Sequence, residues 1–107
     1  MASIVRVDEN ELPWADYTGV APGLVRFKTI AGRGDGAPPT TFVEYAPGHE
    51  DGVHSHDEGE VFVITAGEVT VGDTVNGPGT IVYIPSGVEY SMRSGDDGVR
   101  FFRIVVP

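Results

Sequence analysis

GHEDGVHSHDEGEVFVITAG, residues 48–67, contains all three histidines of the chain. His54 and His56 are two residues apart, so on a β-strand their side chains point to the same face. Residues 57–59 have the composition of a turn, and Glu60 then opens the next strand candidate. Two imidazoles and one carboxylate on adjacent strands form a facial set of ligands that suits Fe(II) and leaves coordination positions open.

Strand candidates lie on both sides of this stretch. Runs of β-branched and aromatic residues between Gly, Pro, Asn and Ser turns predict the strands. Their ranges are Ser3–Val7, Leu24–Ile30, Thr40–Tyr45, His54–His56, Glu60–Thr65, Glu68–Val71, Thr80–Ile84, Tyr90–Arg93 and Arg100–Val106. Helical periodicity is limited to a weak signal at residues 9–17. Short strands at this spacing predict an all-β antiparallel barrel or jelly roll with little or no helix.

Composition agrees with one small β domain. The 107 residues include 15 Gly and 8 Pro, which would interrupt helices but suit tight turns between strands. With 40% hydrophobic residues, the chain is expected to fold rather than stay disordered. The chain has no cysteine, which excludes disulfides and Cys-based zinc sites. The N-terminus lacks the apolar region of a signal peptide, and no apolar run is long enough to span a membrane, so we expect a cytoplasmic protein.

The charge is strongly uneven along the chain. The net charge is −9, and no Lys or Arg occurs between Arg33 and Arg93, where ten carboxylates lie. Nucleic-acid binding needs a basic face and is therefore disfavoured. Most of these carboxylates are interpreted as a solvated acidic surface, although a concentrated negative field also suits a cation.

The stretch at residues 48–67 resembles the first sequence motif of the cupin superfamily. The motif positions correspond to Gly48, His54, His56, Glu60 and Gly67. A second cupin motif is similar to residues 79–94, through Gly79, Pro85 and Gly87. The chain is thus identified as a small single-domain cupin, a monocupin. The resemblance implies an antiparallel double-stranded β-helix (jelly-roll cupin barrel) as one domain, 1–107, with a core at about 24–106 and an N-terminal arm at 1–23.

The resemblance also implies a metal centre. A divalent ion (Fe, Mn, Ni or Zn) would be bound by His54, His56 and Glu60. The histidine that usually supplies the fourth ligand is replaced by Tyr90, and the asparagine that ends the second motif is replaced by Ser94. Three roles are open for Tyr90: a phenolate ligand, an acid–base or substrate-orienting group, or a filler of a barrel with a degenerate site. The second role is favoured because tyrosine can transfer a proton.

Strand parity predicts part of the cavity wall. Phe62, Ile64 and Met92 share the parity of Glu60 and Tyr90, so they are expected to line the cavity. His49 precedes the motif positions that bind metal and is interpreted as a loop residue. Trp14 is expected to close an end of the barrel or an interface. An inward-pointing basic residue would favour a carboxylate substrate, and the candidates for the cavity rim are Arg26, Lys28, Arg93 and Arg103.

Two functions remain open. The first is a metal-dependent enzyme, a dioxygenase or a lyase or isomerase, acting on a small oxygen-rich organic molecule, with Tyr90 as its catalytic residue. The second is a non-catalytic barrel that binds or senses a small ligand. The expected partner is a small molecule, with no nucleic acid and no membrane. Because the predicted strand Ser3–Val7 is an exposed edge, a homodimer is also expected.

Overall fold

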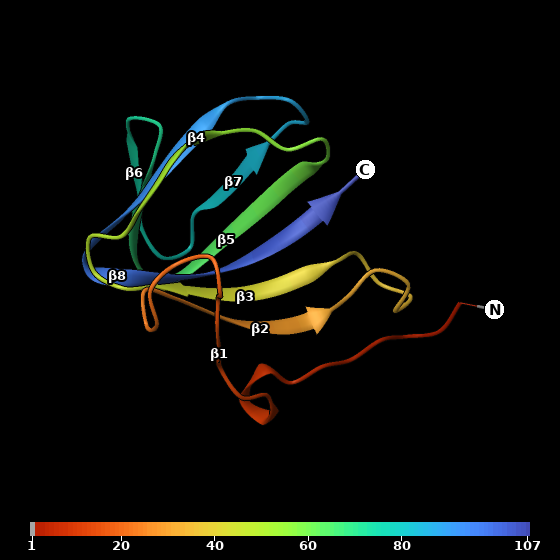
Figure 1. Cartoon of the computed structure of the whole chain (residues 1–107). Helices are drawn as coiled ribbons and strands as arrows, with labels where there is room; N and C mark the ends of the chain where they lie inside the picture. The colour runs from red at the N-terminus through yellow and green to blue at the C-terminus, as the bar shows by residue number, and fades with distance from the viewer. Residues whose placement is uncertain (1) are drawn as a thin grey trace.

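A computed structural model describes residues 2–107 of the chain as an almost entirely β structure (Figure 1). Its strands form one sheet in the order β1-β2-β3-β8-β5-β6, with β4 paired to β8, β7 paired to β5, and every pair antiparallel. The strands are β1 (Ala15–Asp16), β2 (Val25–Ala31), β3 (Thr40–Tyr45), β4 (Glu50–His54), β5 (Gly59–Val71), β6 (Thr74–Asn76), β7 (Ile81–Ile84) and β8 (Tyr90–Val106). The predicted all-β jelly-roll fold is confirmed.

Helix is limited, in the described residues, to the short 3₁₀ turn η1 (Glu9–Glu11). Asp8 caps this turn by accepting a hydrogen bond from the backbone N–H of Asn10 at 2.9 Å. The weak helical signal at 9–17 therefore corresponds to a single turn. No helix within residues 2–107 has the length and apolar character needed to cross a membrane.

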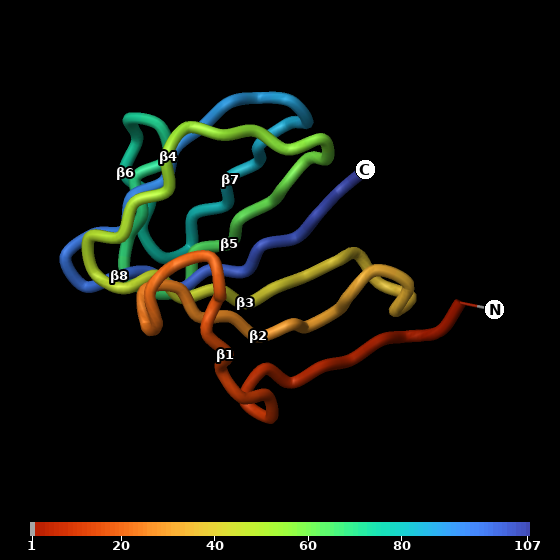
Figure 2. Tube along the Cα trace, in the orientation of Figure 1, coloured from red at the N-terminus to blue at the C-terminus, as the bar shows by residue number. Residues whose placement is uncertain are grey.

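The long strands β5 and β8 shape the interior. They pair with each other from Gly59 opposite Val106 to Val71 opposite Met92. The N-terminal part of β8 also pairs with β4, and its C-terminal part pairs with β3. In Figures 1 and 2, β2 and β3 lie on one side of this long pair, and β4, β6 and β7 lie on the other. Since β5 and β8 belong to both halves, their curvature closes the sheet around a cavity.

Gly67 permits the bend in β5. The register between β5 and β8 shifts on both sides of this residue. Gly67 has φ +69°, and a Cβ atom there would lie 2.1 Å from the carbonyl oxygen of Gly98. A side chain would therefore be strained by the left-handed conformation and would also collide with the backbone of β8. This close approach explains why the motif ends in glycine.

The core lies between the two halves of the barrel. Phe62 and Phe101 are 1% and 2% exposed, and their rings meet edge to face with centroids 5.3 Å apart. Ile64 and Val69 beside them are also buried. Burial of one such side chain contributes about 1.5–3 kcal/mol to folding, so this cluster is a principal source of stability.

The N-terminal segment packs on the outer face of the sheet. The Trp14 ring lies 5.3 Å from the Phe42 ring, and Phe42 stacks on Phe102 at 4.4 Å. The Trp14 ring is also surrounded by Arg26, Lys28 and Arg100, whose charged groups lie 4.7–5.2 Å from its centroid. Trp14 thus covers the outside of β2, β3 and β8, and the expectation that it closes an end of the barrel is wrong.

One predicted strand does not form, and another has the wrong ends. Residues 3–7 have no strand partner within the described chain, and Ile4 is 98% exposed. The apolar residues there predict a strand, but they form no ladder with another strand of the described chain. The range His54–His56 is also wrong, because β4 begins earlier, at Glu50, and ends at His54.

The other differences concern strand ends. The ranges Glu60–Thr65 and Glu68–Val71 join into β5, and Tyr90–Arg93 and Arg100–Val106 join into β8. The glycines between them bend a continuous ladder instead of ending it. The short strands β1 and β6 were not predicted, since two or three residues give too little pattern to detect.

Candidate functional site

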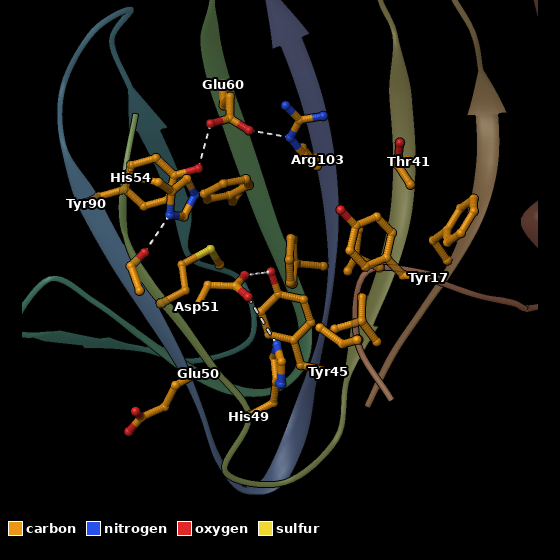
Figure 3. A pocket seen from close by; sticks show the side chains of 18 of the residues that line it. Tyr17, Thr41, Tyr45, His49, Glu50, Asp51, His54, Glu60, Tyr90 and Arg103 are labelled. Carbon is orange, nitrogen blue, oxygen red and sulfur yellow. Dashed lines mark hydrogen bonds and ion pairs between the residues drawn. The ribbon is translucent and has the colours of Figure 1, made fainter. Parts of the chain in front are cut away.

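A cavity of about 780 Å³ opens inside the barrel, within the usual size range of small-molecule sites (Figure 3). Its wall comes from β2, β3, β4, β5 and β8. Phe62 and Met92 lie in this wall, as their strand parity predicts. Ile64 is not among the residues that line it, because β5 carries it deeper into the core, where it is 1% exposed.

Glu60 is the central polar group at one end of the cavity. Its side chain is 1% exposed. The Tyr90 hydroxyl donates a hydrogen bond to Glu60 Oε1 at 2.6 Å, and Arg103 Nε donates to Oε2 (Figure 3). His56 Nε2 lies 3.5 Å from Oε1. A buried carboxylate is costly unless it is paired, and here Arg103 and Tyr90 together meet that requirement.

The two motif histidines reach this end of the cavity from the end of β4 and the turn after it. His54 lies opposite Tyr90 in the β4–β8 ladder, with their rings 4.5 Å apart. The His56 ring lies 5.1 Å from the His54 ring in an edge-on arrangement. A hydrogen bond from the backbone N–H of Gly87 to the His56 carbonyl, 2.8 Å long, fixes the turn. The turn, and not strand alternation, therefore brings the imidazoles together.

His54 has a defined tautomer. Its Nδ1 lies 2.7 Å from the carbonyl oxygen of Gly52. A carbonyl oxygen only accepts hydrogen bonds, so Nδ1 carries the hydrogen and a neutral ring has its lone pair on Nε2. Metal-binding histidines are commonly oriented by such a contact to their other nitrogen.

The donor atoms fit a divalent ion in kind, but the geometry gathers them only in part. His56 Nε2 and Glu60 Oε1 face each other, and the Tyr90 hydroxyl is hydrogen-bonded to the same Glu60 oxygen. Within residues 2–107, however, no group of three or more His, Asp or Glu side chains is arranged to hold a metal ion. Binding by all three predicted ligands would require the hydrogen bonds of Glu60 to rearrange.

Tyr90 is a neutral hydrogen-bond donor in this arrangement. Burial, and next the hydrogen bond to Glu60, raise the pKa of Tyr90 well above that of an exposed tyrosine. Its ring also contacts Phe62, with centroids 6.0 Å apart. The phenol therefore does more than fill space, since it supplies one of the two side-chain hydrogen bonds to Glu60.

A second polar cluster lies at the other end of the cavity, and the sequence analysis missed it. Asp51 accepts a hydrogen bond from the Tyr45 hydroxyl, and its other oxygen lies 3.1 Å from His49 Nε2. Burial, followed by the contact with Asp51, raises the pKa of Tyr45. The His49 side chain is only 8% exposed, although its backbone lies in the predicted loop. The register shift in β4 between Asp51 and His54 turns this cluster inward, and strand parity alone does not reveal it.

The comparisons with known proteins identify the family. Residues 41–106, more than half of the chain, match the family described as cupin domain. The chain belongs to the cupin family. None of the curated proteins compared matches its sequence significantly. The match covers the region from β3 to β8, which contains every predicted ligand of this cupin.

Solved structures support the same fold. The polyketide cyclase RemF from Streptomyces resistomycificus superposes with a TM-score of 0.80 at 18% identity, over 96% of this chain and 79% of RemF. KdgF from Halomonas sp. superposes with a TM-score of 0.76 at 14% identity, over 94% of this chain and 90% of KdgF. A protein of unknown function from Rhizobium leguminosarum bv. viciae 3841 superposes with a TM-score of 0.69 at 25% identity, over 81% of this chain and 85% of that protein.

Proposed function

We propose that this cupin is a metal-dependent enzyme that acts on a small oxygen-rich organic molecule, by a dioxygenase, lyase or isomerase reaction. The metal would be a divalent ion, Fe, Mn, Ni or Zn, bound by His54, His56 and Glu60. The observation that carries the proposal is the placement of Glu60, a fully buried carboxylate that faces a histidine and a phenol at the wall of a roomy cavity. Buried titratable groups in a cavity are typical of catalytic sites.

The residues of the chain have distinct tasks in this proposal. A bound divalent ion would supply Lewis acidity toward the oxygen atoms of the substrate. Tyr90 holds a proton at its hydroxyl oxygen, where it can orient a substrate oxygen or pass the proton to it. Phe62, Met92 and Phe101 form an apolar part of the same cavity wall, where the body of a substrate would pack. The fold of the polyketide cyclase RemF is compatible with an enzyme, although fold alone does not choose a reaction.

Metal content tests the ligand set. We expect the purified protein to bind a divalent metal stoichiometrically, and His56→Ala to reduce the bound metal to background, measured by elemental analysis. His49→Asn is the matched control, because it removes a histidine from the same cavity outside the proposed ligands. Equal metal content in the wild type and His56→Ala would contradict the proposed site.

Turnover tests the role of Tyr90. A panel of diketones, catechols and uronates would identify a substrate for the metal-loaded protein. Tyr90→Phe should then keep the metal and lower the rate by about 10²–10⁴-fold, the range for one proton-transfer group. Unchanged rate and metal affinity in Tyr90→Phe would remove Tyr90 from the catalytic assignment. Weaker metal binding in this variant would instead assign Tyr90 as a ligand.

A non-catalytic ligand-binding or sensor protein is the second candidate. It is favoured by the hydrogen bonds that already engage both oxygens of Glu60, because a carboxylate with both oxygens paired is stable in the wall of a ligand cavity. Binding without turnover across the same panel, by protein of known metal content, would support this candidate over the enzyme.

We also propose that the protein forms a homodimer through its N-terminal segment. Ile4 is 98% exposed, and Val5 and Val7 are 44% and 40% exposed, which leaves an extended apolar segment able to pair with a second copy. Light scattering at micromolar concentration should give the dimer mass, and Ile4→Asp should shift it toward the monomer. A monomer mass for the wild type would refute the proposal.

A further inference from the structure

Arg103 differs from the other basic residues of the chain in facing the cavity. Arg26, Lys28 and Arg100 surround Trp14 on the outer face of the sheet. Arg33 pairs with Glu58, and Arg93 with Glu50, at exposed positions. Among the Lys and Arg residues, only Arg103 is part of the described cavity wall.

The strand register explains the direction of Arg103. It lies opposite Thr41 on β3 and opposite Phe62 on β5, and both of these residues also line the cavity. Residues directly opposite each other in an antiparallel sheet project to the same face. Phe101, two residues earlier on β8, lines the cavity as well. Arg103 is therefore held on the inner face by the same alternation that buries the core.

Part of the Arg103 guanidinium is available to a ligand. Its Nε donates to Glu60, and no hydrogen bond from Nη1 or Nη2 to a described residue is present. In Figure 3 the dashed line to Glu60 starts at Nε, and no line starts at either terminal nitrogen. The side chain is 33% exposed, so ligand molecules can reach it. Arginine donates five N–H groups in a planar fork, of which four belong to the terminal nitrogens.

We propose that the cavity selects a small molecule that has a carboxylate at one end and an apolar body, with the carboxylate bound to Nη1 and Nη2 of Arg103. This inference rests on the proposed function and names its substrate class. Glu60 and Arg103 balance each other's charge, while the free edge of the guanidinium matches the geometry of a carboxylate. The apolar body would lie along Phe27, Val43 and Phe101 on the same wall.

Paired acids and amides test the inference on the full-length protein. The probes are benzoate, phenylacetate and hexanoate, each compared with its neutral amide by calorimetry. We expect at least one acid to bind about tenfold or more tightly than its amide, as a charge-assisted contact predicts. If none of the acids binds more tightly than its amide, the inference is wrong. This comparison uses only wild-type protein, so it does not depend on the folding of a variant.

Arg103→Lys locates the contact. Lysine keeps a positive partner for Glu60 but lacks the planar fork, so acid binding should weaken about tenfold while amide binding stays the same. Arg100→Gln is the matched control, since Arg100 lies on the same strand but faces outward, and it should bind like the wild type. An Arg103→Lys protein that keeps the full preference for acids would overturn the assignment.

A chelator separates this inference from the metal proposal. Preference for acids that persists in EDTA and is lost in Arg103→Lys supports Arg103, whether or not the protein binds metal. Preference that disappears in EDTA would assign the carboxylate to the metal, which would refute the role of Arg103 and leave the proposed metal centre standing.

Discussion

Replacing Tyr90 by Phe removes one hydroxyl group from the buried end of the cavity. That hydroxyl donates to Glu60 Oε1 at 2.6 Å, with Tyr90 7% and Glu60 1% exposed. Hydrogen bonds to charged groups contribute about 1.5–3 kcal/mol, and water cannot easily replace the lost donor at a buried site. Because Arg103 still pairs with the carboxylate, we expect the free energy of unfolding to fall by about 2 kcal/mol. For a chain of 107 residues, this lowers Tm by about 9 °C.

Urea unfolding in the presence of EDTA, followed by circular dichroism, measures this change without a contribution from metal. The urea midpoint should fall by about 1–2 M with an unchanged slope. Tyr83→Phe is the matched control, because Tyr83 is 58% exposed and its change should stay within about 0.5 kcal/mol. Equal stability of the Tyr90→Phe and Tyr83→Phe proteins would refute the hydrogen bond between Tyr90 and Glu60.

Two further predictions concern the backbone and alkaline pH. Gly67→Ala should lower the free energy of unfolding, measured in urea, by about 3 kcal/mol, because the added Cβ atom collides with the backbone of Gly98 in addition to the backbone strain. Gly72→Ala is the control: Gly72 has φ +64° with open space around it, so the free energy of unfolding should fall by only about 1 kcal/mol. Equal effects of the two substitutions would contradict the close approach at Gly67. The pKa values of Tyr45 and Tyr90 are raised in the folded state above the ordinary value of 10.0. Above about pH 10 these tyrosines therefore lose their protons in the unfolded chain but keep them in the folded protein. The free energy of unfolding should then fall by about 1.4 kcal/mol per pH unit for each tyrosine. A free energy of unfolding that stays constant up to about pH 11 would contradict their burial.

Most of the fold could be predicted because its signals are local. Runs of β-branched and aromatic residues between turn residues predict β2, β3 and β7 to within one residue of their observed ends. The merging of short ranges into β5 and β8 could not be predicted, because a glycine looks the same in a turn and in a bend of a continuous strand. The difference depends on which backbone passes nearby, as Gly98 does at Gly67.

The candidate site was predicted only in part. The motif spacing predicts that His54, His56 and Glu60 lie close together, and the structure places them at one end of the cavity. Their use as metal ligands stays a prediction. The cluster of Tyr45, Asp51 and His49 was missed, because its members come from two strands and the loop between them and carry no recognised spacing.

The sequence by itself determined the fold class, the family and the grouping of His54, His56 and Tyr90 with Glu60, since these follow from strand and turn composition and from fixed spacings along the chain. Only the tertiary structure decided the partners of those groups. Arg103 is 43 residues from Glu60 in the sequence, yet the β5–β8 ladder brings the two side chains together. The physical reason is that strand register, set by bends and bulges in the ladders, determines which side chains share the interior.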